Sequence, residues 1–314
     1  MPDWLIERGI GESRAARIED GEIVEAQILL DGILRAGSVL QARLNKTGVP
    51  ALAIADRQEL LLPKGAPGIT EGSSFQLEVT REAIPGAEPW KRPLARVAQD
   101  GSIGGSSLDG VALAFPAPAD TLGTAGWNDL IDEARSGIVR FAGGELRVSP
   151  TPAMTLIDVD GNLAANELAM LGAQAAAQTI LRHDIGGSIG IDLPTIAGKA
   201  QRQAIGEAVD AILPQPFERT AVNGFGFLQI VRPRRRASLF ELAADRTSFE
   251  ARALMRRVAL ETPGAKQVLA HPAVIAALER RSDWIEALER QVGGAVALRS
   301  EPSLPIHGGY AENL

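Results

Sequence analysis

Between residues 138 and 232, short apolar runs alternate with longer amphipathic stretches. The short runs are rich in β-branched residues and are bounded by Gly or Pro, as β-strands usually are. The longer stretches, 165–183 and 199–213, have the length and composition of helices. Such alternation is typical of a mixed sheet flanked by helices. We therefore predict a mixed α/β core over residues 121–250.

The chain before this core has another pattern. Residues 1–33 alternate around Glu19-Asp20-Gly21, which predicts a β-hairpin. Residues 34–98 contain about five short apolar runs separated by the turn sequences TGVP, PKGAPG and AIPGAEP. This spacing predicts a small closed β-barrel, for which the OB-fold is the main candidate and any other small barrel the alternative.

Two further segments complete the predicted organisation, a mixed α+β protein of several domains. Residues 99–120 are rich in Gly, Ser and Pro, as linkers are. Residues 251–314 predict two or three helices and a strand, forming a small α/β domain.

Composition excludes several classes of chemistry. The chain has no cysteine, which rules out disulfides, thiol catalysis, iron–sulfur clusters and cysteine-ligated zinc. Its three histidines, His183, His271 and His307, are far apart, which argues against serine–histidine and zinc hydrolases. No apolar run approaches the roughly 20 residues of a membrane span, and the acidic N-terminus is unlike a signal peptide. We expect a cytoplasmic protein without membrane contact.

Carboxylates are the reactive groups that remain. The stretch TLIDVDGN places Asp158 and Asp160 at the end of one apolar run, and GGSIGIDLPT places Asp192 at the end of another. Asp158 and Asp160 are two apart, so on a strand they share a face. Neighbouring carboxylates repel unless a cation lies between them, and Mg²⁺ or Mn²⁺ favours such oxygen ligands.

Other interpretations of these acids remain open at this point. Residues 158–161 could form a simple turn, with Asp192 ending its strand before Pro194. DVDGN also resembles the D-x-D-G loop of aspartate-nucleophile phosphatases, although Asn162 replaces the threonine of that family. Gly186 and Gly187 precede a strand, whereas phosphate loops follow one, so a phosphate loop is discarded.

Positive charge is concentrated in one part of an acidic chain. The net charge is −7, yet residues 181–260 contain twelve Lys and Arg against eight Asp and Glu. Within them, Arg232, Arg234, Arg235 and Arg236 form a short basic run. Such a run is either a solvated loop or a group of phosphate contacts for a nucleic acid.

Several segments together, and in order, resemble the bacterial ribonuclease E/G endoribonucleases. The similar segments are SRAARIEDGEIVEAQI, ARSGIVRFAGGELRVSPTPAMTLIDVDG, ILRHDIGGSIGIDL, NGFGFLQIVRPRRR and the C-terminal HPAVIAALERRSDWIEALERQVGGAVALRSEPSLPIHGGYA. The resemblance covers most of the chain except about residues 98–120. It implies an OB-fold RNA-binding barrel inserted into an RNase H-like/DNase I-like nuclease core, followed by a small α/β C-terminal domain.

The resemblance also assigns roles to residues. Asp158 and Asp192 take the places of the two magnesium-binding aspartates, and Asp160 stands where the family has an asparagine that orients them. RNA-binding roles fall on one strand and the run after it, namely Phe225, Gly226, Arg232, Arg234, Arg235 and Arg236. Asp158, Asp160 and Asp192 would thus be catalytic, with Asp158 and Asp192 as ligands of Mg²⁺ or Mn²⁺.

The chain departs from the family at several places, among them a shorter loop between Asp158 and Asp192. The paired cysteines that bind a shared zinc are missing, so no zinc is expected. Residues 98–120 are too short for the domain that senses a 5′-monophosphate. The family's T-N-L-E-A motif reads AMLGA around residue 171, and the barrel has few aromatic residues for base stacking.

These features imply a reduced member of the family that hydrolyses single-stranded RNA in RNA processing or decay. The alternative is an RNA-binding protein that keeps the scaffold and is catalytically weak or inactive. The C-terminal helices are candidates for pairing protomers into a homo-oligomer.

Overall fold

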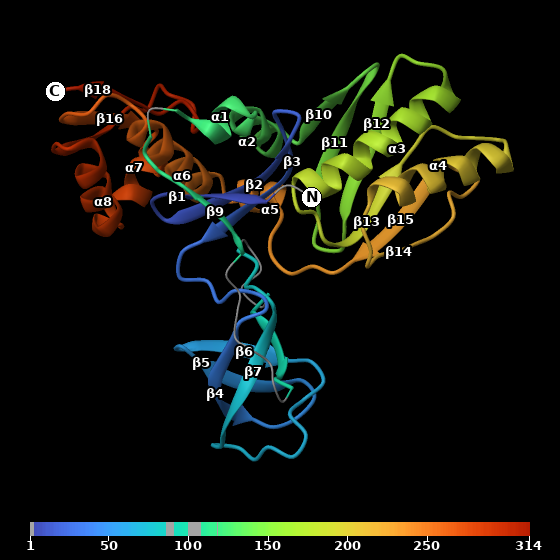
Figure 1. The fold of residues 1–314 in the computed structure, drawn as a ribbon, viewed down its shortest axis with the longest axis horizontal. Helices are drawn as coiled ribbons and strands as arrows, with labels where there is room; N and C mark the ends of the chain where they lie inside the picture. The colour runs from blue at the N-terminus through green and yellow to red at the C-terminus, as the bar shows by residue number, and fades with distance from the viewer. Residues whose placement is uncertain (1–2, 86–90, 100–107, 118) are drawn as a thin grey trace.

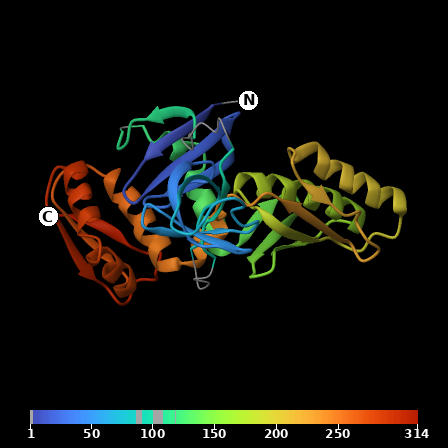
Figure 2. The same cartoon turned by 90° about the horizontal axis from the view of Figure 1, so that it is seen from below.

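The computed structural model describes residues 3–85, 91–99, 108–117 and 119–314. Within these residues the strands form three open sheets and one closed barrel. The barrel extends from one side of an elongated body, which has a six-stranded sheet at one end and the C-terminal domain at the other (Figure 1). In the view from below, the barrel lies in front of the middle of the body (Figure 2). The predicted mixed α+β organisation is confirmed.

The N-terminal hairpin forms as predicted. Glu19 and Glu22 pair across it, and the loop residues Asp20 and Gly21 have φ of 51° and 85°, as a two-residue turn that follows the strand twist requires. This sheet has the order β3-β2-β1-β9. Its strands are β1 (Trp4–Arg8), β2 (Glu12–Glu19), β3 (Glu22–Leu30) and β9 (Gly110–Leu113).

Strand β9 comes from the segment that we predicted as a linker. Residues 110–113 pair parallel with β1, because the edge of β1 offers unpaired backbone groups that a short extended segment can satisfy. Part of the predicted linker is therefore sheet. Its residues 100–107 and 118 lie outside the described residues.

The barrel forms within the predicted range 34–98. Its strands, in the closed order β4-β5-β6-β8-β7, are β4 (Val39–Lys46), β5 (Ala51–Ala55), β6 (Gln58–Leu62), β8 (Leu94–Val97) and β7 (Ser74–Arg81). Leu44, Leu60 and Leu77 are fully buried inside it. The prediction of a small closed barrel is confirmed, and the strand order is consistent with an OB-like barrel.

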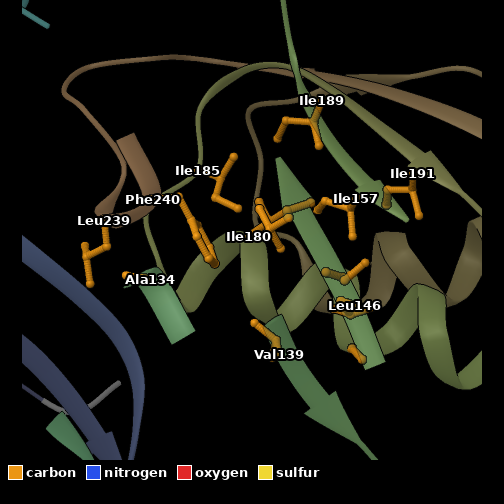
Figure 3. Close-up of a cluster of buried hydrophobic side chains, with 14 of the residues drawn as sticks. Ala134, Val139, Leu146, Ile157, Ile180, Ile185, Ile189, Ile191, Leu239 and Phe240 are labelled. Atoms are coloured by element: carbon orange, nitrogen blue, oxygen red, sulfur yellow. The ribbon is translucent and has the colours of Figure 1, made fainter. Parts of the chain in front are cut away.

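The six-stranded sheet is mixed and has the order β10-β11-β12-β13-β15-β14. Its strands are β10 (Ile138–Phe141), β11 (Gly144–Pro150), β12 (Thr155–Gly161), β13 (Gly187–Asp192), β15 (Phe227–Arg232) and β14 (Glu218–Arg219). Helix α3 (Ala165–Arg182) packs on one face, with α4 (Lys199–Ile212) beside it. Leu146, Ile157 and Ile180 meet between sheet and helix (Figure 3).

Short helices join this sheet to the rest of the body. They are α1 (Thr121–Thr124), α2 (Trp127–Ser136) and α5 (Leu239–Ala244). Trp127 and Leu130 of α2 share one hydrophobic core with Ala16 and Ile28 of the N-terminal sheet. The N-terminal strands and the six-stranded sheet are therefore parts of one packed unit.

The C-terminal domain contains more sheet than we predicted. Its helices are α6 (Arg246–Ala259), α7 (Pro272–Glu279) and α8 (Ser282–Val292), and its strands are β16 (Lys266–Ala270), β17 (Val296–Ser300) and β18 (Tyr310–Asn313). The order of the strands is β17-β16-β18, whereas the sequence predicted only β17. The predicted boundary at residue 251 falls inside α6.

Buried ion pairs fasten α6 to the N-terminal sheet. Arg256 contacts Glu7 at 2.9 Å, and Arg252 contacts Glu12 at 2.9 Å. Arg14 contacts both glutamates, at 2.6 and 2.8 Å. All five side chains are almost fully buried, where the loss of one partner leaves an uncompensated charge.

Among the described residues, no helix has both the length and the apolar character that a membrane span requires.

Candidate active site

The six-stranded sheet has one buried and one open face. Along β12, Ile157 and Val159 point into the core, while Asp158 and Asp160 alternate with them and are exposed. The same open face shows apolar side chains to solvent, with Leu156 39% and Val231 49% exposed. A sheet that is covered by helices on one face leaves the other available for a ligand.

Asp158 and Asp192 lie side by side on this open face. Strands β12 and β13 are parallel, and the two aspartates are directly paired in their register. Paired residues of neighbouring strands project to the same side of a sheet, and both side chains are exposed. The structure thus brings together the two acids that the sequence places 34 positions apart.

The simple-turn interpretation of residues 158–161 is wrong. Strand β12 continues through Gly161, with Asp160 paired to Glu145 of β11. Asp160 therefore projects from the same face as Asp158, two residues beyond the position that is paired with the end of β13. Asp192 does end its strand, before Pro194.

The surroundings of Asp158 oppose its negative charge. Partial burial raises the pKa of the Asp158 carboxyl, and the carboxylates of Asp160 and Asp192 raise that pKa further. The guanidinium of Arg147 acts in the opposite direction. Three acids thus repel one another at one end of the sheet, which is the condition in which a cation is stabilising.

These residues fit a hard divalent cation held by few protein ligands. Within the part of the chain that the structure describes, no three Asp, Glu, His or Cys side chains are grouped so that they could enclose a metal ion. The Asp158 and Asp192 carboxylates would be the protein ligands. Mg²⁺ commonly binds one or two carboxylates and keeps the remaining positions for water or substrate oxygens.

The rows of paired residues show which other side chains adjoin the aspartates. Arg147 is paired with Asp158, and Phe227 is paired with Asp192. The outer row, two residues further along β11 and β12 on the same face, contains Arg140, Glu145 and Asp160. In it Glu145 is paired with Arg140 on one side and with Asp160 on the other. Beside this outer row lies a shallow hollow of about 440 Å³, lined in part by Arg140, Glu145 and Asp160.

Sequence reasoning missed Arg140, Glu145 and Arg147. The signal was present in GELRVSP, where Glu145 and Arg147 alternate with the buried Leu146 and Val148. A hairpin with this alternation must place both charges on one face. Their relation to Asp158 depends on the register of β11 against β12, which the sequence does not specify.

The loop before β15 brings Phe225 and Gly226 to the aspartate end. Leu193, next to Asp192, donates its backbone N–H to Gly226 O at 3.2 Å. Gly226 has φ of +92°, and a Cβ there would lie 2.2 Å from Leu193 O. The Asn223 carboxamide accepts hydrogen bonds from the backbone of Phe225 and Phe227. The Phe225 side chain is 83% exposed at the end of this turn.

The basic run lies at the other end of the same strands. Arg232 is paired with Gly187 and Phe227 with Asp192. Five residue steps separate these two pairs, about 16 Å at the usual rise of a strand. The structure therefore does not bring the arginines to the aspartate pair.

Hydrogen bonds or ion pairs to other described residues engage the side chains of Arg232, Arg234 and Arg236. Arg232 donates to Ile180 O and Ile185 O near the end of α3, where a cation is favoured by the helix dipole. Arg234 is bonded to Glu241, and Arg236 contacts Asp184 at 3.0 Å. Arg235 is exposed, so it is the member best placed to meet a phosphate.

No protein-family model matches the sequence, and a search of curated proteins finds no match either.

Proposed function

We propose that the chain is a magnesium-dependent endoribonuclease of the ribonuclease E/G type that hydrolyses single-stranded RNA. The observation that supports this most is the direct pairing of Asp158 with Asp192 on an exposed sheet face. The proposed family rests on the order of the sequence segments that resemble it. The barrel, whose strand order is consistent with an OB-like barrel, would offer a second surface for the same substrate.

The charges of the open face explain why a metal would be needed. Asp158, Asp160, Asp192 and Glu145 face Arg140 and Arg147 there, so acids exceed bases by two. A phosphodiester approaching this face would be repelled. One divalent cation held by Asp158 and Asp192 would offset that excess.

Each residue has a defined part in this proposal. Asp158 and Asp192 would hold Mg²⁺, and Asp160 would add negative charge that favours the cation. When bound, Mg²⁺ supplies a water activated for attack and a counter-charge for the phosphate oxygens. Phe225 offers a ring on which a base can stack, an interaction worth about 1–3 kcal/mol. By the family resemblance, the products carry a 5′-phosphate and a 3′-hydroxyl.

Further along the substrate, Arg235 would contact a phosphate at the far end of β15. Such a contact positions a strand without reading its sequence. The C-terminal domain, whose strand β18 presents the 42% exposed Tyr310, is the surface through which protomers would pair.

A cleavage assay tests the proposal. Fluorescent single-stranded RNA is incubated with the wild-type protein, Asp158→Asn, Asp192→Asn and the control Asp283→Asn, an exposed carboxylate of the C-terminal domain. We predict Mg²⁺-dependent cleavage that falls at least about a hundredfold in the two site variants, because a metal supplies several kcal/mol of transition-state stabilisation. Full activity in either site variant, with its circular dichroism unchanged, would refute the assignment.

One observation favours a second candidate, a binding protein without catalysis. Arg147 already gives the aspartate pair a cation from the chain itself, which could stabilise the site without a metal. Such a protein would bind RNA equally well in EDTA and in Mg²⁺ and would never shorten it. The same assay, with binding measured in both conditions, separates the two candidates.

A further inference from the structure

We infer that Arg147 is a phosphate-binding residue of this site and that Glu145 holds its guanidinium until the substrate arrives. The inference rests on the proposed function, because it names a further contact to the same RNA backbone. It follows from the position of two charged side chains on β11 and from the partners that each has within reach.

Arg147 stands next to the acids that would hold the metal. It is paired with Asp158 across β11 and β12, and Asp158 is paired with Asp192 across β12 and β13. Side chains that are paired across antiparallel strands have Cβ atoms about 5 Å apart. A phosphate in contact with a cation at the aspartate pair would therefore lie beside the Arg147 guanidinium.

The guanidinium is accessible and only partly engaged. The Arg147 side chain is 56% exposed. Among the described contacts, one of its nitrogen atoms donates to Glu145 Oε1 at 2.7 Å. A guanidinium carries five N–H donors in a planar fork that matches two phosphate oxygens. Donors are thus left for a bidentate contact with a phosphodiester.

A second arginine is available to Glu145 as an ion-pair partner. Glu145 lies between Arg140 of β10 and Asp160 of β12 in the register of the sheet, and Arg140 is exposed. When a phosphate takes the Arg147 guanidinium, the Glu145 carboxylate can pair with Arg140 instead. The exchange leaves no charge without a partner, so substrate can displace Glu145 at small cost.

Substitution of each partner separates this role from that of a structural ion pair. If the pair only stabilised the hairpin, Arg147→Gln and Glu145→Gln would break the same contact and have the same effect. If Arg147 binds phosphate, the two variants must act in opposite directions. Arg147→Gln removes the contact, whereas Glu145→Gln frees the guanidinium and removes a repelling carboxylate.

The experiment measures the affinity for a fluorescent single-stranded RNA by anisotropy over a range of salt concentrations. Ca²⁺ replaces Mg²⁺, and a gel verifies that the RNA stays intact. The variants are Arg147→Gln, Arg147→Lys and Glu145→Gln. The control is Arg299→Gln, which removes the charge of an exposed strand arginine of the C-terminal domain. This domain lies at the opposite end of the body from the six-stranded sheet (Figure 1).

We expect Arg147→Gln to weaken binding at least about tenfold, because both charge-assisted hydrogen bonds of the bidentate contact are lost. The slope of the logarithm of the binding constant against the logarithm of the salt concentration should become shallower by about 0.7, the value for one phosphate contact of a single strand. The affinity of Arg147→Lys should lie between those of Arg147→Gln and the wild type, because lysine keeps the positive charge but lacks the planar guanidinium. Glu145→Gln should bind severalfold more tightly than the wild type.

The inference is overturned if Arg147→Gln binds like Arg299→Gln, or if both partners of the pair change affinity in the same direction. These results are independent of the proposed catalysis, since binding is measured without turnover. If the wild-type protein cleaves RNA and Arg147→Gln binds RNA normally, only the inference about Arg147 is refuted. If the wild-type protein never cleaves RNA, while Arg147→Gln and Glu145→Gln still change the affinity in opposite directions, only the proposed enzymatic activity is refuted.

Discussion

Asp158 has a carboxyl group whose charge is disfavoured by its surroundings in the absence of a bound cation. Burial contributes most to its raised pKa, and Asp160 contributes more than Asp192. Apolar strands gain no stability from three carboxylates at one end of their sheet. We attribute their presence to a ligand that they bind.

Asp160→Asn tests this electrostatic arrangement. The substitution removes the neighbouring charge that raises the pKa of Asp158 most, so that pKa falls. Asp158 then ionises at a lower pH, and we predict that the acid limb of the kcat/KM profile for RNA cleavage moves to lower pH. The measurement is a pH series with saturating Mg²⁺. An acid limb that stays in place or moves to higher pH would contradict the assigned order of charge effects.

At the level of single residues, the sequence was enough to place the acidic side chains at the ends of neighbouring strands, and it was not enough to place the basic side chains beside them. Asp158 and Asp192 could be predicted because each ends an apolar run. Arg147 could not, because its place beside Asp158 depends on strand register. For Arg232 and Arg236, the density of positive charge suggested phosphate contacts, while their hydrogen bonds are to the end of α3 and to Asp184.

At the scale of secondary-structure elements, the position of β12 is set by its contact with α3. Gly172 of α3 lies against Val159, and a Cβ at Gly172 would come within 2.3 Å of Val159 Cγ1. Val159 stands between Asp158 and Asp160 in the sequence. Displacement of Val159 would therefore move the strand that carries the site.

Gly172→Ala is predicted to destabilise the protein by about 1–2 kcal/mol. Overpacking costs about 1–3 kcal/mol and is partly offset by the higher helix propensity of alanine. RNA cleavage should decrease together with stability, since β12 must shift. Urea unfolding and the cleavage assay measure the two effects.

Gly206→Ala on α4 is the matched control. Its Cβ would meet the guanidinium of Arg219, the movable end of a side chain whose partner Asp210 is half exposed. We expect this control to be neutral or slightly stabilising. Equal losses of stability and of RNA cleavage in Gly172→Ala and Gly206→Ala would show that the contact with Val159 has no special role.

Elements were predictable where hydrophobic periodicity is strong. The helices of 138–232 and all its strands except the two-residue β14 follow from it, as does the hairpin at Asp20-Gly21. Strand β9 was missed because its residues are largely exposed at a sheet edge, so no apolar alternation marks them. Strand β16 pairs with both β17 and β18, and sequence periodicity does not show such pairing of distant segments.

At the scale of the whole molecule, the barrel is attached to the body through a buried carboxylate. Glu82, at the end of the barrel strands, is 5% exposed and lies 3.6 Å from Arg35 and 3.5 Å from Arg236. Its backbone N–H also donates to Arg235 O at 2.7 Å. Part of the basic run thus holds the barrel against the body. The presence of the barrel was predictable, whereas this attachment joins residues that are distant in sequence.

Glu82→Gln should loosen that attachment. Loss of one partner of a buried ion pair costs about 3–5 kcal/mol, and here the weakened contacts lie between barrel and body. We predict a larger maximum dimension in small-angle X-ray scattering and a wider spread of barrel orientations. Glu78→Gln, which removes a carboxylate paired with Arg96 within the barrel, should leave the scattering profile unchanged. Identical profiles for Glu82→Gln and the wild type would exclude Glu82 as the anchor.

The proposed nuclease requires that the exposed, paired carboxylates of Asp158 and Asp192 bind a divalent cation. Mn²⁺ binding followed by electron paramagnetic resonance, in the absence of RNA, tests it most directly. We predict that the wild-type protein binds Mn²⁺ and that this binding weakens at least about tenfold in Asp158→Asn and in Asp192→Asn, because each substitution removes one of two charged ligands. Equal Mn²⁺ binding by the wild type and both variants would contradict it.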